Sequence, residues 1–184
     1  MDSQRVRGAT DLPSYMAASV TYSATAAATV VFEISNPTAS APPLQRIVRV
    51  QRILFSAVQT VAGNIGDWRL EKRATSTGGT SASMTAVPLD SGQKAATASA
   101  LNYTANGTPG ALVGILWQPR MLVPAPATAV NPAYVFDFDT SQLLNGKPIS
   151  LRAGEALSLN FGGGTIPTGL ASCQVSVFWT EEKI

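Results

Sequence analysis

Residues 45 to 61, QRIVRVQRILFSAVQTV, form the longest β-prone stretch of the chain, rich in Val, Ile and Phe and free of Gly and Pro. Val48 and Val50 share one face of an extended strand, and further along Ile53 and Phe55 share a face. The two apolar sets are out of phase by one residue, so a strict two-residue alternation cannot turn both toward one core. We therefore expect a β-bulge or a sharp twist near residues 51 and 52. A strand of this length, re-aimed midway, can belong to both sheets of a sandwich.

Shorter β-prone runs lie on both sides of this stretch, separated by Gly-, Pro- and Asn-rich turns. Examples are TVVFEIS at 29–35, YVFDF at 134–138 and CQVSVFW at 173–179. Each alternates with the two-residue period of a strand, and no helical period competes with it. The pattern predicts an all-β protein, an antiparallel β-sandwich or jelly-roll of about eight or nine strands. This domain is expected to span residues 28–184, after an extended N-terminal arm at 1–27 that is rich in Ala, Ser and Thr.

One predicted strand differs from the others because it is apolar on both faces. Leu112 to Trp117 reads LVGILW, so we expect it to be buried on both sides or to lie at a subunit contact. Trp117 precedes Gln118-Pro119 at the strand end, and it is the tryptophan we single out for ligand or subunit contact. Trp68 and Trp179 fall in alternating apolar runs and are predicted to lie in the core.

Composition favours association with other subunits. The 184 residues are 45% hydrophobic and only 13% charged, whereas about 25% charged residues is usual for soluble domains. A chain with so few charges suits burial against copies of itself, so we expect a homo-oligomer. The net charge of +2 is too small to indicate a nucleic-acid-binding face.

The inventory of reactive side chains predicts no enzyme and no cofactor. The chain has no histidine, which excludes His-based triads and most zinc sites. Its single cysteine, Cys173, lies in an alternating apolar run and is expected to be a small buried residue. Asp137 and Asp139 lie two apart and are interpreted as solvated. The alternatives are that the two carboxylates hold a cation, or that they are the acid and base of a carbohydrate-active enzyme. The glycine runs at 78–79 and 162–164 are predicted loops, since neither has the context of a phosphate-binding loop.

No stretch of the chain indicates a membrane protein or a secreted one. The N-terminal residues lack the apolar core of a signal peptide. No window approaches the roughly 18 continuous apolar residues of a membrane span. We therefore expect the protein to be made, or assembled, in a cytoplasm, with no membrane partner.

Basic residues recur along two predicted strands: Arg46, Arg49 and Arg52, and then Arg69, Lys72 and Arg73. If the strands are adjacent, these residues form a basic stripe that contacts an acidic partner or nucleic acid. The alternative, which we favour, is cross-strand pairing with Asp67 and Glu71, because few exposed aromatic residues accompany the stripe. The candidate interface residues are Arg46, Arg49, Arg52, Trp117 and, from the arm, Tyr15 and Tyr22.

The order of turns and strand edges resembles a family of tailed-bacteriophage virion proteins of β-sandwich type. The resembling segments are ISNP at 34–37, RIVRVQRI at 46–53, RATSTGGTS at 73–81, TAVPLDS at 85–91, YTANGTPGALVG at 103–114, LRAGEALSLNFGG at 151–163 and VFWTEE at 177–182. Together they cover roughly residues 28–182, and the arm lies outside the match. The resemblance carries no functional residues over to this chain.

This resemblance implies a structural protein of a virion. We expect a capsid decoration (cement) protein, a homotrimer that contacts the major capsid protein or other virion proteins, with the arm reaching over a neighbour. The alternative is a receptor- or glycan-binding module of a tail or head fibre. In that case the Ser-, Thr- and Gly-rich loops at 74–83 and 162–169 would form the recognition tips.

Overall fold

The structure is a computed structural model of the chain. It describes residues 12–23, 30–37, 46–59, 64–105, 107–118, 120–123, 133–138, 147–161 and 170–183; the side chains at 59, 64–66, 121–123, 161 and 170–171 lie outside this description. The described part contains thirteen strands, more than the eight or nine expected. They are β1 (Ser14–Ala18), β2 (Val30–Ser35), β3 (Arg46–Gln59), β4 (Asn64–Ala74), β5 (Thr80–Ser83), β6 (Ala86–Pro88), β7 (Ser99–Ala105), β8 (Leu112–Trp117), β9 (Arg120–Val123), β10 (Tyr134–Asp137), β11 (Ile149–Leu151), β12 (Glu155–Phe161) and β13 (Leu170–Lys183). None of the described segments is a helix with the length and apolarity needed to cross a bilayer.

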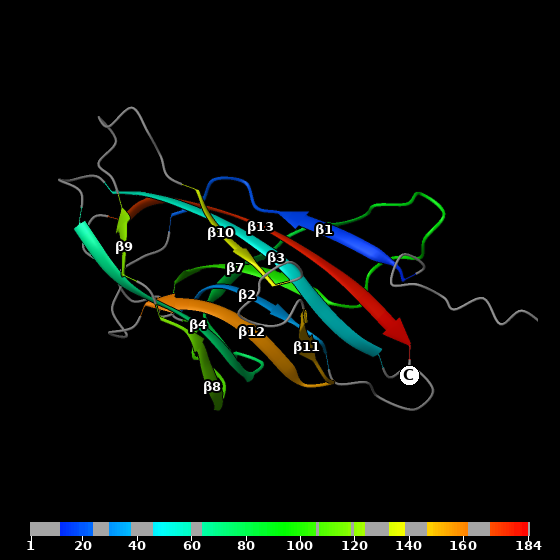
Figure 1. Cartoon of the computed structure of the whole chain (residues 1–184). Coiled ribbons are helices and arrows are strands. Elements are labelled where there is room, and N and C mark those ends of the chain that lie inside the picture. Colours follow the sequence, from blue (N-terminus) through cyan, green and yellow to red (C-terminus); the bar gives the residue numbers. More distant parts are fainter. Residues whose placement is uncertain are drawn as a thin grey trace, which may run out of the picture.

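The strands form two antiparallel sheets that pack face to face (Figure 1). Sheet A has the order β10-β3-β13-β1-β6, with β11 also paired to β3. Sheet B has the order β5-β7-β2-β12-β4-β8, with β9 also paired to β4. The β-sandwich that the alternation predicted is therefore confirmed.

The long strand β3 bulges where the sequence predicts. It pairs with β13 along nearly its whole length, and both strands have 14 residues. Phe178 lies opposite Arg52 and Trp179 lies opposite Val50, so Gln51 is the extra residue of a β-bulge. Because the bulge reverses the alternation, both apolar sets of β3 face the core. The buried members are Val48, Val50, Ile53, Phe55 and Ala57.

β3 nevertheless stays within one sheet. Its second edge pairs with β11 at residues 48–50 and with β10 at residues 52–55, and all of these strands belong to sheet A. The expectation that this strand would belong to both sheets is wrong. The bulge reverses the direction in which the side chains of β3 point, and the strand stays in sheet A.

The core fills the space between the sheets and is rich in aromatic rings. The ring centroids of Phe55 in sheet A and Trp68 in sheet B lie 4.5 Å apart in a tilted arrangement. Trp179 stacks on Tyr15 with the ring centroids 5.6 Å apart. Trp68 and Trp179 are fully buried, as predicted for both.

Part of the expected arm belongs to the sandwich. Ser14–Ala18 form β1, which lies between β13 and β6 in sheet A, with Tyr15 opposite both Trp179 and Pro88. Tyr15 and Ala17 are buried on one side of the strand, so this short stretch has an apolar face that packs into the core of the sandwich. The prediction of an extended arm is therefore wrong for residues 14–18, and residues 1–11 and 24–29 lie outside the described residues.

Two further strands lie in segments for which no strand was predicted. β5 lies inside the expected loop at 74–83, at the edge of sheet B beside β7. β9 lies in the Pro-studded segment after Trp117 and pairs with β4. Both are only four residues long, and short runs at an edge carry little hydrophobic pattern from which a strand can be predicted.

Candidate interaction surface

One of the two edge strands of sheet B, β8, exposes apolar side chains on both of its faces. Among the described residues no strand pairs with its outer edge, so its backbone groups on that side are open. Five of its six residues are large, apolar and between 42% and 63% exposed. These residues define the β8 patch: Leu112, Val113, Ile115, Leu116 and Trp117. The sequence predicted that this strand is either buried on both sides or placed at a subunit contact. The exposed fractions exclude burial within the chain.

Trp117 lies where the edges of the two sheets approach each other. Its ring meets the ring of Phe136 of β10 edge to face, with the centroids 4.6 Å apart. Phe136 is buried, whereas Trp117 remains 42% exposed. Trp117 is therefore anchored on its inner side and presents the rest of its indole outward, an arrangement common for aromatic residues at interfaces.

The β8 strand is irregular. Trp117 lies opposite Leu70 and Ile115 lies opposite Glu71, so Leu116 is an extra residue. A second register shift makes Val113 extra, between residues 112 and 114. Bulges of this kind twist an edge strand and disturb its hydrogen-bonding groups, which protects an open edge against pairing with another strand.

The three arginines of β3 form ion pairs within the chain. Arg46 Nη1 donates to Glu181 Oε2 at 2.8 Å, and Arg52 Nη2 donates to Asp137 Oδ2 at 2.6 Å. Arg49 pairs with Glu182. All three carboxylates come from the neighbouring strands β13 and β10 of sheet A.

The basic residues of β4 belong to the other sheet. Glu71 pairs with Arg73 and, at 3.9 Å, with Arg69, while Lys72 Nζ lies 2.8 Å from Glu155 Oε2. Asp67 pairs with Arg120 of β9. The six basic residues therefore form no single stripe, because β3 and β4 are consecutive in the chain but lie in different layers. Pairing, the interpretation that we favoured, is confirmed in kind, although most of the partners differ from those expected.

Tyr15 and Tyr22 are core residues of the sandwich, and this corrects their expected place on an arm surface. Tyr15 is fully buried and Tyr22 is 7% exposed. Tyr22 bridges to Cys173, and its hydroxyl donates to the carbonyl oxygen of Val31 at 2.8 Å. Val31 is the extra residue where the register between β2 and β12 shifts, so the tyrosine supplies a hydrogen bond where the ladder is disturbed.

Replacing Tyr22 with Phe is expected to lower the free energy of unfolding by about 1–2 kcal/mol, because it leaves a buried carbonyl oxygen without its donor. Equilibrium urea unfolding measures this loss. Tyr15→Phe is the matched control. The Tyr15 hydroxyl donates to the carbonyl oxygen of Lys94 at 2.8 Å in a contact that is only partly buried, so its removal is expected to cost less. An equal loss in both variants would contradict the role assigned to Tyr22.

The two aspartates of the Asp-x-Asp pair do not form a described site. Asp137 pairs with Arg52, and Asp139 lies outside the described residues. Within the part of the chain that the structure describes, no group of three or more His, Cys, Asp or Glu side chains is gathered to hold a metal ion.

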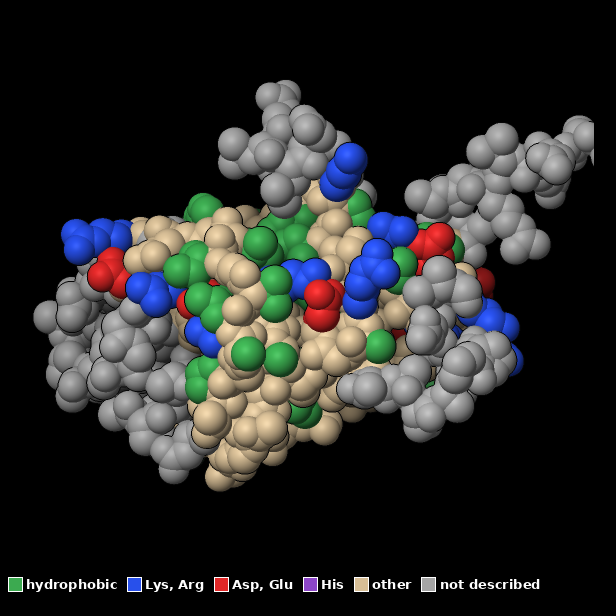
Figure 2. All heavy atoms as spheres, turned by 90° about the horizontal axis from the view of Figure 1, so that it is seen from below, with side chains coloured by type: hydrophobic (Ala, Val, Ile, Leu, Met, Phe, Trp, Pro, Cys, Tyr) green, Lys and Arg blue, Asp and Glu red, His purple; other side chains and the backbone are tan. Residues whose placement is uncertain are grey.

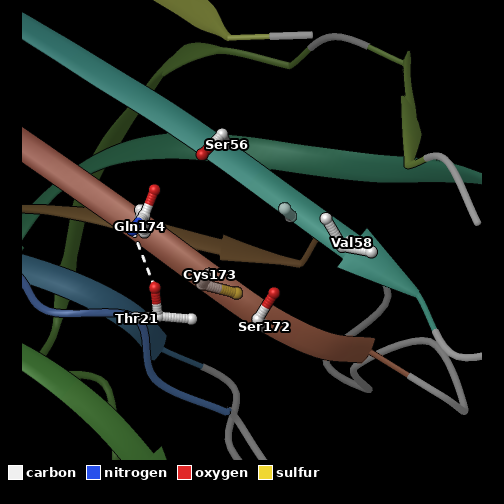
Figure 3. A pocket seen from close by; sticks show the side chains of 7 residues that line it. Thr21, Ser56, Val58, Ser172, Cys173 and Gln174 are labelled. Atoms are coloured by element: carbon white, nitrogen blue, oxygen red, sulfur yellow. Dashed lines mark hydrogen bonds between the residues drawn. The ribbon is translucent and has the colours of Figure 1, made fainter. Parts of the chain in front are cut away.

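A shallow pocket of about 270 Å³ opens beside Cys173 (Figure 3). Ser56, Ser172 and Gln174 contribute to its lining, and Gln174 Nε2 donates to Thr21 Oγ1 at 2.7 Å. The Cys173 side chain is 1% exposed, and burial raises the pKa of its thiol to about 12. Because the thiolate is the reactive form, this cysteine is the inert buried residue that the sequence predicts.

The described polar loop at 75–79 is fixed at its base and exposed at its tip. Glu33 of β2 is fully buried and accepts hydrogen bonds from the backbone N–H and the hydroxyl of Ser76. Burial raises the pKa of Glu33, and the bonds from Ser76 oppose that rise only in part. Gly78 and Gly79, with φ of 63° and 75°, then turn the chain into β5, whose four residues are all exposed. The loop expected at 162–169 lies outside the described residues.

One well-defined polar centre was missed by the sequence reasoning. Glu181, in the closing segment VFWTEE, is fully buried and accepts hydrogen bonds from the backbone N–H groups of Thr97 and Ala98. The only sign of its burial in the sequence is its position in the alternation of β13, between buried Trp179 and exposed Lys183. That position does not predict that the loop at residues 97 and 98 donates the hydrogen bonds.

Comparison with protein-family models, with curated proteins and with solved structures found no match to this chain.

Proposed function

We propose that this protein is a non-enzymatic structural component of a bacteriophage particle, a capsid decoration (cement) protein. It stabilises the head through subunit contacts, both with copies of itself and with the major capsid protein or other virion proteins. The sequence resemblance supports the assignment to a virion, and the exposed β8 patch supports a role in subunit contacts.

The observation that supports this proposal best is the β8 patch. The largest exposed apolar patch on a typical soluble monomer covers roughly 300–600 Å², and such a patch is often functional. In this chain such side chains are concentrated on one edge strand, while the arginines that might have formed a charged docking face are neutralised by internal pairs. Figure 2, which views the molecule from the side where Figure 1 places β8, shows hydrophobic side chains at the surface of this face.

A cement role predicts a high copy number. Purified particles are expected to contain this protein in a fixed proportion to the major capsid protein, and particles depleted of it are expected to lose their genome at a lower temperature. Quantitative mass spectrometry of particles and a heat-release assay measure the two quantities. A handful of copies per particle, or unchanged heat resistance after depletion, would rule out the decoration role.

The second candidate is a receptor- or glycan-binding module, and the loop at 75–79 favours it. Its base is fixed by Glu33, and its exposed side chains are small and polar, which suits recognition of a hydroxyl-rich ligand. Binding to immobilised glycans that is lost on replacing Thr77 and Thr80 with Ala, with the fold intact, would support this function over decoration.

A further inference from the structure

We infer that a second copy of this chain covers the β8 patch. The two patches pack against each other across a two-fold axis, through their side chains, which gives a dimer in place of the homotrimer expected from the resemblance. This inference rests on the proposed function only in taking the patch as a contact surface, and it names the occupant of that surface.

The size of the patch suits a protein interface. Five large apolar side chains that are about half exposed present on the order of 300–400 Å² per copy. This is nearly half of the roughly 800 Å² that each partner buries in a standard interface. The backbone of β8 and the polar residues beside it, such as Gln118 and Arg120, lie where they can supply a rim.

The chemistry of the patch selects a copy of itself as the partner. β8 carries no charged side chain, and the nearby Arg120 is already paired with Asp67, so a charged partner finds no counter-charge there. Elsewhere in the described chain fewer large apolar residues are exposed: Val20, Val87, Leu89 and Val135. The matching apolar surface is therefore another β8 patch, and a two-fold axis brings identical surfaces together.

The two bulges decide how the copies meet. A regular edge strand would add a partner strand through backbone hydrogen bonds. In β8 the register shifts at Val113 and at Leu116 disturb the spacing of those groups. The contact is accordingly made by side chains from both faces of the strand, with Trp117 held in place by Phe136.

Val113→Lys is the direct test, because this residue is 63% exposed and its side chain makes no described ring contact. The wild-type chain at micromolar concentration is expected to have twice the 19.1 kDa mass of one chain by light scattering. In the variant two lysines face each other near the axis, so the dissociation constant is expected to rise at least about 100-fold. Val20→Lys, at an 81% exposed position on another part of the surface, is the control that keeps the wild-type mass.

The melting temperatures of the wild type and of Val113→Lys are compared at high dilution, where both are single chains. Equal values are expected, and they show that the variant dissociates without losing its fold. A wild-type chain that stays monomeric up to about 100 µM would overturn the inference, and so would a mass three times that of one chain. An equal rise of the dissociation constant in Val20→Lys would also overturn it. A single chain that still coats particles would overturn the pairing and leave the decoration role standing. A dimer that binds no particle would do the reverse.

Discussion

Replacing Glu181 with Gln is expected to lower the free energy of unfolding at pH 7 by about 3 kcal/mol, because it removes one partner of a buried ion pair. The carboxylate is fully buried, and Arg46 Nη1 lies 2.8 Å from it. It also accepts hydrogen bonds from the N–H groups of Thr97 and Ala98, at 2.8 and 2.9 Å, and from the Thr97 hydroxyl, at 2.6 Å. The glutamine has nearly the same shape as the glutamate, but it lacks the negative charge that strengthens the hydrogen bonds from these donors.

The effect of Glu181→Gln depends on pH. Burial by itself raises the pKa of Glu181, but the hydrogen bonds from Ala98, Thr97 and Arg46 outweigh it and hold the pKa below the usual value of 4.5. A carboxyl whose pKa is lower in the folded state stabilises the fold above its unfolded pKa, and this stability is lost as the pH falls through the folded pKa. The difference between wild type and variant is therefore expected to be full at pH 7 and to shrink steadily once the pH falls below the usual pKa of 4.5.

Glu182→Gln provides the matched control for Glu181. It lies next in the chain and pairs with Arg49, but its side chain is 38% exposed. Exposed pairs contribute about 0–1 kcal/mol, so this variant is expected to remain close to the wild type at all pH values. Urea unfolding at pH 7 and at pH 3.5 makes the comparison. If the two glutamines cost the same, Glu181 is not the centre that holds the loop at 97–98 to sheet A.

Replacing Gly110 with Ala is expected to lower the free energy of unfolding by about 3 kcal/mol through a steric clash with backbone. A β-carbon at this position would lie 2.6 Å from the carbonyl carbon of Ala74 and 2.7 Å from the carbonyl oxygen of Thr75. Neither group can rotate away as a side chain would. The shift that relieves the clash also breaks the hydrogen bonds from Arg73 to the carbonyl of Gly110, at 2.8 Å, and from Ala74 N–H to Ala111, at 2.9 Å.

Gly114→Ala separates this clash from the general effect of adding a methyl group. A β-carbon on Gly114 would meet nothing within 4 Å, although the residue lies only four positions further along the chain. The substitution is expected to be neutral, or to stabilise the fold by up to about 1 kcal/mol through the unfolded state. Both variants are compared by urea unfolding at low protein concentration, so that self-association does not contribute. Equal destabilisation would show that the close approach to Ala74 is not the cause.

The fold class could be predicted from the sequence because it follows from local alternation. The phase change between Val50 and Ile53 requires an extra residue for both to reach one core, and the structure places that residue at Gln51. The inert environment of Cys173 followed in the same way, from its neighbours along one strand.

Properties that depend on which strands become neighbours could not be predicted from the sequence. The six-residue run of β8 is equally compatible with a buried centre and an exposed edge, and its position at the end of sheet B decides between them. The arginines of β3 lie far along the chain from Glu181, Glu182 and Asp137, which become their partners only when β13 and β10 align beside β3.

The sequence by itself thus determined that the chain forms strands, where the longest one bulges and which side chains it buries, since each follows from a two-residue period within a few neighbouring positions. The tertiary structure alone decided that Tyr15 enters a sheet, that Glu181 is buried among donors and that β8 is left at an open edge. The physical reason is that strand order and register are set by contacts between distant segments, which local periodicity does not encode.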